Sequence, residues 1–367
     1  MNNEHEWVED FYRQALAENR PDKLVLLDLT EQMESLSKEN PDQRLALCER
    51  GHTLATQFNE PWWSAFFGFW KCEILLYQKH DPEAALRVAA ALVVETRGAG
   101  FRAFPYRVAI HLNFIAAYFK IDPIGYAPQI RAALENSEME WDQYPSFYLL
   151  YWQLRTRFLT ALDNPEAVEI GWQHFGHACH YHATQDNGSS HYVIYALVDL
   201  LNALHRFDRT QARRQVVELA EMGADLSRRD ANERLNAIFT MWRAVGARFS
   251  RNESEAKRFY RLAQQKQAAL SPPRNATFPI ALVFHEAGGE GELALAICDE
   301  AIEVARSRAH WFEAASYGSR KCEILRGLNR PWQSEAAPLR EVAAHLPSQE
   351  YWEEKLRDWQ RMDESGE

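Results

Sequence analysis

The most constraining feature of this sequence is a pattern of small residues that returns about every 42 residues along the chain. In each copy an Ala is followed by a small or apolar residue at positions four and seven further on, which places these residues on one face of an α-helix. Small side chains on one face let two helices pack closely, as antiparallel helix pairs require. The sequence therefore predicts a tandem series of helical hairpins, with copies at Ala84/Val88/Ala91, Ala167/Gly171, Ala212/Val216/Leu219, Ala256/Tyr260/Ala263, Ala294/Cys298/Ala301 and Ala336/Ala343.

Helix-start signals precede three of the expected helices, at Asn40-Pro41-Asp42, Asp81-Pro82-Glu83 and Asn164-Pro165-Glu166. In each of them an Asn or Asp can cap the helix, and a Pro fits the first turn without losing a bonded N–H. The acid that follows meets the positive end of the helix dipole. Convincing strand alternation is absent from the sequence, so we predict an all-α fold.

Direct internal similarity supports a duplication. Residues 45–75 align without gaps on residues 295–325, an offset of 250. The identities include the run Lys71-Cys72-Glu73-Ile74-Leu75 against Lys321-Cys322-Glu323-Ile324-Leu325. Others are Leu45/Leu295, Ala46/Ala296, Cys48/Cys298, Ala55/Ala305, Ala65/Ala315 and Gly68/Gly318. Duplication of a structural unit explains this match better than coincidence.

An acidic helix start followed by the small-residue pattern resembles the tetratricopeptide repeat (TPR), most clearly in residues 81–86 (DPEAAL) and 291–302 (GELALAICDEAI). The resemblance covers roughly residues 40–345. It implies a right-handed α-α superhelix, a TPR-like solenoid of about seven helical hairpins whose helices are longer than in the usual repeat of ~34 residues. A generic solenoid of helical hairpins is the other interpretation that the pattern allows.

Three regions follow from this interpretation. Residues 1–39 are expected to form an N-terminal helical segment, and residues 40–345 the repeat array. Residues 346–367 would contribute a charged capping helix and a tail, because the end of a solenoid needs a polar outer face.

Charge and composition narrow the classes of partner. The net charge of −11 repels nucleic acid and anionic lipid headgroups, and the sequence has no continuous apolar run long enough to span a membrane. The start of the chain is polar and acid-rich, without the apolar core of a signal peptide. Five Cys, an odd number without a CxxC pair, favour reduced thiols over disulfides or a zinc ribbon. We therefore expect a cytoplasmic protein with a protein or peptide partner.

Polar residues set inside otherwise apolar first helices are the candidate binding residues. The resemblance implies that first helices line a concave surface. Burying a polar group without a partner costs ~1 to 3 kcal/mol, so these residues need one. Two interpretations stay open, contact with a peptide ligand and hydrogen bonding between repeats. The candidates are Arg107, His111, Tyr195, Asp199, Asn202, Arg206, Asn236, Thr240 and Arg243.

A histidine-rich helix raises the question of a metal site. His174, His177, Cys179, His180 and His182 lie within nine residues, and His191 follows a short loop. A transition metal needs three or four ligands that converge on one point, whereas residues three apart on one helix fan around it. We therefore expect no metal and no other cofactor.

Three functions remain after the motif search. The sequence has no Walker loop, no dinucleotide-binding glycine turn, and no HExxH, GxSxG or kinase signature. The first hypothesis is a non-catalytic scaffold or adaptor that holds a cytosolic partner in its concave groove. The second is a peptide-sensing regulator in which residues 2–58 are repositioned by ligand. The third is an α/α-toroid hydrolase. A local density of arginines between residues 206 and 234 is interleaved with acids and is interpreted as a solvated face.

Overall fold

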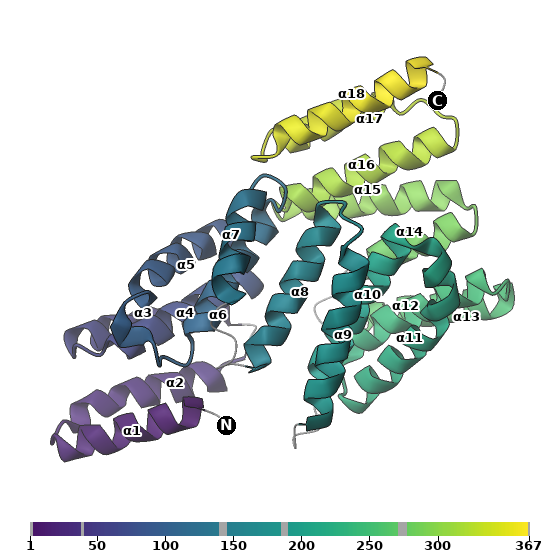
Figure 1. Ribbon diagram of the computed structural model, residues 1–367. Helices are drawn as coiled ribbons and strands as arrows, with labels where there is room; N and C mark the ends of the chain where they lie inside the picture. Colours follow the sequence, from purple (N-terminus) through teal and green to yellow (C-terminus); the bar gives the residue numbers. More distant parts are fainter. Residues whose placement is uncertain (1–2, 38–39, 139–144, 185–189, 271–276, 366–367) are drawn as a thin grey trace. The chain divides into compact units, whose positions relative to one another are not determined.

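The computed structural model describes residues 3–37, 40–138, 145–184, 190–270 and 277–365. Within these ranges all regular structure is helical, with eighteen α-helices and two 3₁₀ helices (Figure 1). The predicted all-α class is therefore confirmed. Consecutive helices pack against one another along the chain, as a helical repeat requires.

The chain divides into two compact units. Unit 1 comprises Met1–Ile121 and Pro128–Phe147, and unit 2 comprises Asp122–Ala127 and Tyr148–Glu367. The helices of unit 1 are α1 (Asn3–Ala17), η1 (Pro21–Leu24), α2 (Val25–Ser35), α3 (Pro41–Gln57), α4 (Pro61–Tyr77), α5 (Pro82–Thr96), η2 (Ala99–Phe101), α6 (Arg107–Ile121) and most of α7 (Ala127–Glu138). The predicted domain boundaries after residues 39 and 345 stay predictions.

Unit 2 contains the remaining helices and the larger apolar core. They are α8 (Pro145–Ala161), α9 (Ala167–Thr184), α10 (His191–Phe207), α11 (Arg209–Arg229), α12 (Glu233–Phe249), α13 (Glu253–Ala268), α14 (Phe278–Ala287), α15 (Gly291–Ser307), α16 (Trp311–Gly327), α17 (Gln333–Ala343) and α18 (Gln349–Ser365). The first residues of α8 belong to unit 1. Within the described residues, no helix is long and apolar enough to cross a membrane.

The small-residue pattern lies where helices touch in five of its six predicted copies. In α5 the predicted copy is wrong by one residue: Ala84 is half-buried and Ala91 exposed, whereas Ala85, Ala89 and Leu92 are buried. Ala212, Ala256 and Ala294 are all buried. Close approach is visible at Gly223 of α11, where an added Cβ would stand 2.2 Å from the ring of Phe239 on α12. Small side chains therefore set the spacing between the two helices of a hairpin, as the pattern predicts.

Helix starts follow the expected chemistry with one difference. The Asp81 carboxylate accepts a hydrogen bond from the Ala84 N–H at 2.9 Å, and Asn164 Oδ1 accepts one from the Glu166 N–H at 2.9 Å. Asn40 makes no side-chain cap, although α3 begins at Pro41 as expected. Its start therefore depends on Pro41 and on the acid Asp42 in the first turn.

Helix ends share one turn that the sequence did not reveal. In the described part of the chain, eight residues other than Gly have a positive φ, all of them within three residues of a helix end. The next residue commonly donates its N–H to a carbonyl five positions back. An example is Asn59, with φ 57°, followed by the Glu60 N–H donating to Ala55 O at 2.8 Å. This left-handed turn satisfies carbonyls that the helix end leaves without partners. The set is Asn19, Asn59, His80, Asp163, Ala231, Arg251, Ala309 and Asn329.

The duplication is reproduced helix by helix. Helices α3 and α4 span residues 41–57 and 61–77, and α15 and α16 have the same lengths at an offset of 250 residues. An equivalent ion pair joins each hairpin, Lys71 with Glu49 at 2.9 Å and Lys321 with Asp299 at 2.7 Å. The internal similarity therefore reflects a repeated structural unit.

The duplicated block extends to a helix that sequence comparison at a constant offset missed. Helix α1 carries the run FYRQA at residues 11–15, and α13 carries FYRLA at residues 259–263, an offset of 248. The Phe and the Ala of both runs are buried. A difference of two residues in the connecting chain hid this match.

Candidate functional site

One face of α10 carries four of the nine predicted binding residues, together with His191. We call His191, Tyr195, Asp199, Asn202 and Arg206 the α10 stripe. The two end residues are exposed, Tyr195 and Asn202 are half-buried, and Asp199 is buried. The opposite side of the helix, with Leu197, Leu200 and Leu204, has no exposed surface. The structure therefore places the stripe on the polar side of a strongly amphipathic helix.

Asp199 combines deep burial with an incomplete set of hydrogen bonds. It is 5% exposed, and Arg157 of α8 donates from Nε to its Oδ1 at 2.9 Å. Its Oδ2 is buried and, among the described residues, has no hydrogen-bond partner. Burial raises the pKa of the Asp199 carboxyl, and the charge of Arg157 and the side-chain hydrogen bonds of Arg157 and Gln153 oppose this rise. A donor that reached Oδ2 would relieve the cost of an unsatisfied buried acceptor.

Tyr195 and Asn202 have polar groups that the described part of the fold does not use. Neither the Tyr195 hydroxyl nor the Asn202 amide takes part in a hydrogen bond there. The Tyr195 ring packs edge-on against His191, with ring centroids 4.7 Å apart. Both side chains keep their donors and acceptors available for another molecule.

Arg206 is exposed, but its guanidinium is already paired with a carboxylate of the same chain. Its Nε donates to Oδ1 of Asp163, the left-handed residue after α8, at 2.7 Å. The hydroxyl of Tyr351 on α18 lies 3.5 Å from Oδ2 of the same carboxylate. Asp163 and Tyr351 had no sequence signal, because they lie 43 and 145 residues from Arg206 along the chain.

The three predicted residues of α12 also make contacts within unit 2. Asn236 donates from Nδ2 to Ala224 O at 2.9 Å, and its Oδ1 accepts from Lys266 Nζ at 2.6 Å. Thr240 donates to the Asn236 carbonyl at 2.7 Å. The guanidinium of Arg243 lies over the ring of Phe259, 4.1 Å from its centroid. For this helix, hydrogen bonding and packing between neighbouring helices is the interpretation that the contacts favour.

Arg107 and His111 belong to unit 1, whereas the other predicted residues belong to unit 2. Both are half-buried on α6. Burial, with the nearby charges of Arg107 and Arg97, lowers the pKa of His111 to about 4. The imidazole is therefore neutral near pH 7, and its buried Nε2 has no hydrogen-bond partner in the described residues.

The histidines of α9 spread over several environments. His174 is 1% exposed, and burial lowers its pKa to about 3. The His177 ring stacks on Trp152 of α8 with centroids 5.3 Å apart. Within the described residues, no group of three His, Cys, Asp or Glu side chains is placed to hold a metal ion.

Four of the five cysteines are core residues at repeat-equivalent positions. Cys48, Cys72, Cys298 and Cys322 are buried, and Cys179 is half-buried. Burial raises the pKa of Cys48, Cys298 and Cys322 to about 12 in each case. Such thiols are protonated at neutral pH and lack the thiolate that nucleophilic chemistry requires.

A series of ion pairs, here called the ladder, connects α14, α16 and α18, and the sequence analysis did not predict it. Arg320 of α16 donates to Glu286 of α14 at 2.5 Å and to Glu323 at 2.6 Å. Lys355 of α18 lies 3.1 Å from Glu323. Burial works against the charge of Arg320, but Glu286 and Glu323 outweigh it and keep its pKa above the ordinary value. The ladder links three helices electrostatically.

A second polar network lies at the C-terminal end of α14. His285 contacts Glu290 through Nδ1 at 2.7 Å and the Tyr260 hydroxyl through Nε2 at 2.8 Å. Arg248 donates to Glu290 at 2.8 Å and to the Phe284 carbonyl at 2.9 Å. Burial raises the pKa of Tyr260, so its hydroxyl stays protonated. These hydrogen bonds connect α12, α13 and α14 through Glu290.

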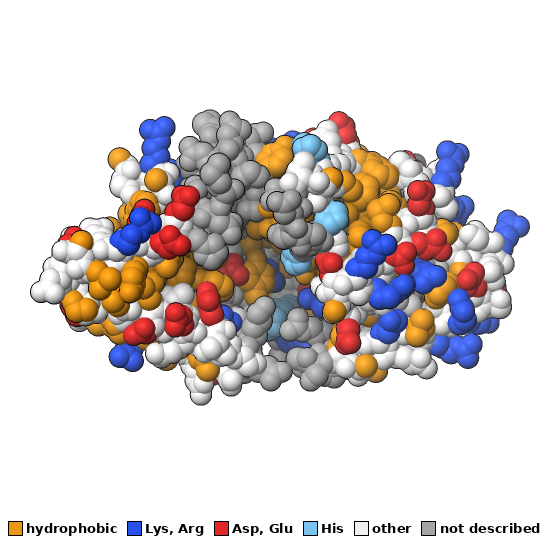
Figure 2. Space-filling model, turned by 90° about the horizontal axis from the view of Figure 1, so that it is seen from below, with side chains coloured by type: hydrophobic (Ala, Val, Ile, Leu, Met, Phe, Trp, Pro, Cys, Tyr) orange, Lys and Arg blue, Asp and Glu red, His pale blue; other side chains and the backbone are white. Residues whose placement is uncertain are grey.

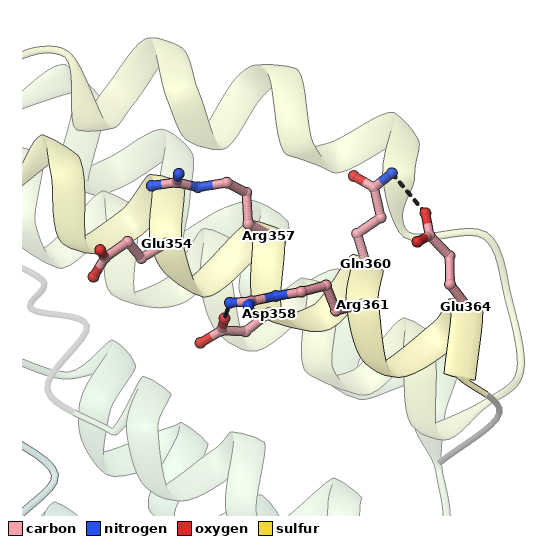
Figure 3. A pocket seen from close by; sticks show the side chains of 6 residues that line it. All are labelled: Glu354, Arg357, Asp358, Gln360, Arg361 and Glu364. Atoms are coloured by element: carbon pink, nitrogen blue, oxygen red, sulfur yellow. Dashed lines mark hydrogen bonds and ion pairs between the residues drawn. The ribbon is translucent and has the colours of Figure 1, made fainter.

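The surface depression drawn in Figure 3 belongs to α18 alone. All six of its lining residues lie on this helix, and two pairs among them already interact: Gln360 donates to Glu364 at 3.0 Å, and Arg361 pairs with Asp358. A depression between the side chains of one exposed helix offers no enclosing wall for a ligand.

We compared the sequence with protein families and with curated proteins. No protein-family model matches the chain, and no curated protein matches it.

Proposed function

We propose that the chain is a non-catalytic scaffold or adaptor with a TPR-like, right-handed superhelix of about seven hairpins. Its concave groove binds an extended peptide or a helical segment of a cytosolic partner. The observation that carries the proposal is the α10 stripe, where Tyr195, Asn202 and Asp199 Oδ2 have hydrogen-bonding capacity that the described residues leave unused. The consecutive packing of helical hairpins supports the same class of protein.

The chemistry of the stripe suits a peptide backbone. A side-chain amide such as Asn202 can pair with a backbone N–H and C=O at once, and a Tyr hydroxyl can donate or accept. Asp199 Oδ2 is buried, so it can accept a peptide N–H only where binding moves the side chains around it, next to the Arg157 guanidinium that compensates the carboxylate. The ligand in this proposal therefore runs along α10 and presents donors to Asp199.

The contacts narrow the predicted site within unit 2. Asn236 and Arg206 bond to other helices or their connections, Thr240 bonds within α12, and Arg243 packs on Phe259, although its buried Nε has no hydrogen-bond partner among the described residues. The proposal therefore rests on Tyr195, Asp199 and Asn202. Arg107 and His111 stay predicted partner-binding residues of unit 1.

Affinity purification from the source organism with mass spectrometry tests the proposal. The bait pair is wild type and Tyr195→Ala/Asn202→Ala, because these half-buried side chains support no described hydrogen bond and their loss should leave the fold intact. A matched control is Gln43→Ala/Gln57→Ala, which changes two exposed residues of α3. A groove partner should lose at least about tenfold in affinity with the first variant and nothing with the control. Unchanged recovery of every partner would exclude the α10 stripe as the binding surface.

A further inference from the structure

A basic patch lies within this acidic protein. Residues 201–270 carry fourteen Lys and Arg against eight Asp and Glu, so this span has a charge of +6 in a chain of −11. The remainder of the chain is therefore −17. Figure 2 shows Lys and Arg side chains gathered on the side of the molecule where α11 and α13 lie in Figure 1. Such a local reversal of sign creates a potential that attracts anionic groups.

The patch is built from the first halves of α11 and α13. Its members are all exposed: Arg209, Arg213, Arg214, Arg251, Lys257, Arg258 and Arg261. The C-terminal end of α12 brings these segments together. Gly246 packs against Val217 of α11, and the Arg213 guanidinium lies 5.7 Å from the centroid of the Phe249 ring. From Phe249 a turn of three residues leads directly into α13.

Most of these charges are not neutralised within the fold. Among the described residues, Arg209, Arg214, Arg251 and Lys257 form no ion pair. Arg258 approaches Glu255 at 3.6 Å, and this pair is exposed and correspondingly weak. The acids of α11, Glu218, Glu221 and Asp225, begin only after the basic segment. Glu253 and Glu255 lie in the first turn of α13, where Glu253 pairs with the buried Arg248 and Glu255 is the partner of Arg258. The patch therefore has a basic centre with an acidic border along α11.

Apolar side chains lie within the same surface. Val217 on α11 and Leu262 on α13 are 38% and 39% exposed. Each follows the basic residues of its helix, next to Arg214 and Arg261 respectively. A partner that suits this surface combines negative charge with apolar side chains.

The duplicated helix shows that the fold itself does not require these charges. Helices α1 and α13 share the buried Phe and Ala of their FYRxA runs. The two residues before the run are Glu9-Asp10 in α1 and Lys257-Arg258 in α13, and all four are exposed. The same helix scaffold therefore carries opposite charge at equivalent positions, and the basic sign is a property of this surface alone.

We propose that the patch on α11 and α13 binds an acidic, partly apolar segment of a second protein. This interaction surface is separate from the α10 stripe and goes beyond the scaffold function proposed above. Long nucleic acids and anionic membranes fit less well, because the strongly acidic remainder of the chain repels extended polyanions. Nucleic acid also leaves the exposed Val217 and Leu262 unused. A second copy of the chain fits less well too, since pairing its acidic part with this patch is a head-to-tail contact that continues into open chains.

The test uses the full chain and a fluorescent, helix-forming peptide with Glu on one face and Leu on the other. Arg209→Glu/Arg214→Glu/Lys257→Glu should weaken binding by at least about tenfold, because three attractive charges become repulsive. The control Arg50→Glu/Arg87→Glu/Arg308→Glu makes the same change in net charge at exposed sites on other segments, and it should stay within about twofold of wild type. Binding should also weaken steadily as NaCl is added, since the contacts are exposed.

Two further binding measurements test whether the partner is an acidic, partly apolar peptide. Val217→Ser/Leu262→Ser should weaken peptide binding severalfold without changing its salt dependence, because this variant removes only apolar contacts. A single-stranded DNA oligomer and phosphatidylserine vesicles should both bind more weakly than the peptide. Equal peptide affinity in the charge-reversal variant and its control would overturn the proposal. Tighter binding of DNA or vesicles than of peptide would overturn it too, as would self-association by sedimentation that the charge-reversal variant abolishes. Tyr195→Ala/Asn202→Ala should leave peptide binding unchanged, so failure here and failure of the groove proposal are separate results.

Discussion

The hairpins α3–α4 and α15–α16 share helix bounds, buried cysteines and an equivalent Lys–acid pair, yet one face of their second helices differs completely. Trp63, Phe66 and Trp70 of α4 correspond to Glu313, Ser316 and Arg320 of α16. In unit 1, Trp7 and Phe11 of α1 pack on Trp63, with ring centroids 4.7 and 5.0 Å apart. In unit 2, Arg320 instead forms the ladder to Glu286 and Glu323.

The comparison separates two roles within one helix. Residues at the contact between the paired helices are kept small in both hairpins, as Ala55/Ala305 and Cys48/Cys298, and Gly68/Gly318 are small where the second helix meets the next one, at Leu92 of α5 and Leu339 of α17. The opposite face of the second helix differs between the two hairpins. Its side chains are apolar in α4, where another helix covers them, and polar or charged in α16, where they contact other polar side chains. Geometry is therefore conserved by the small residues while the chemistry of the outer face varies.

The largest expected effect tests the covered face of α4. Trp63 is 1% exposed, so Trp63→Ala should lower the free energy of unfolding by about 3 to 5 kcal/mol. Glu313→Ala, at the equivalent exposed position of α16, should change it by less than about 0.5 kcal/mol. Urea unfolding followed by circular dichroism measures both. Equal losses for the two variants would mean that the faces do not differ as the packing indicates.

The contact between paired helices gives the next effect. An added Cβ at Gly51 would lie 2.5 Å from the buried Phe67 ring, so Gly51→Ala should destabilise by about 1 to 2 kcal/mol after its gain in helix propensity. The equivalent residue in α15 is already Ala301. Ala301→Gly should also destabilise, by about 1 kcal/mol, because Gly disfavours helix. If either Gly51→Ala or Ala301→Gly stabilised the protein, the helix contact would not be adapted to the residue that each hairpin carries there.

The ladder of α16 predicts a pH-dependent effect. Arg320→Ala should cost about 1 to 2 kcal/mol at pH 7, because it removes the cation from the partly buried Glu286 and leaves Glu323 with Lys355 alone. Lys355 and Arg320 outweigh burial and lower the pKa of Glu323, so this stabilisation is present above pH ~4.3 and is lost as the pH falls through the depressed folded value. The difference between wild type and variant should therefore shrink in acid. Chemical unfolding across pH 3 to 7 measures it, with Arg308→Ala as the exposed control.

The smallest effect concerns the turns. Asn59 and Ala309 occupy equivalent left-handed positions, with φ 57° and 54°. Asn tolerates this conformation better than Ala. Ala309→Asn should therefore stabilise the protein by about 0.5 to 1 kcal/mol, and Asn59→Ala should destabilise it by a similar amount. Thermal unfolding of the two single variants checks the opposite signs, and two shifts of the same sign would rule out the shared turn as their cause.

Local signals explain how much of the fold was predictable. The helix starts expected at residues 40–42 and 81–83 correspond to α3 (Pro41–Gln57) and α5 (Pro82–Thr96), because Pro41, Asp81 and Pro82 all act within a few residues of themselves. The left-handed turns were missed, since most of their residues are not Gly. The positions of the helices could therefore be predicted from the sequence, whereas the left-handed turns that follow their C-terminal ends could not.

The candidate site was less predictable because its contacts are long-range. The polar pattern located the α10 stripe, but it could not separate Asn202, whose amide is unused, from Asn236, which holds Ala224 and Lys266. The partner of Asp199 is Arg157, 42 residues away on another helix. Only the packing of α8 against α10 makes this pairing visible.

The left-handed turn at the helix ends has a consequence for how such a chain can change length. The turn fixes the direction in which the backbone leaves a helix by its own hydrogen bonds, so the following connection need not be of fixed length. One residue separates Asn59 from α4, whereas three residues separate Asp163 from α9, so connections of different length follow the same turn. Each hairpin is thus an exchangeable cassette with a defined exit, and the connections just beyond these turns are the natural junctions for grafting or deleting a repeat.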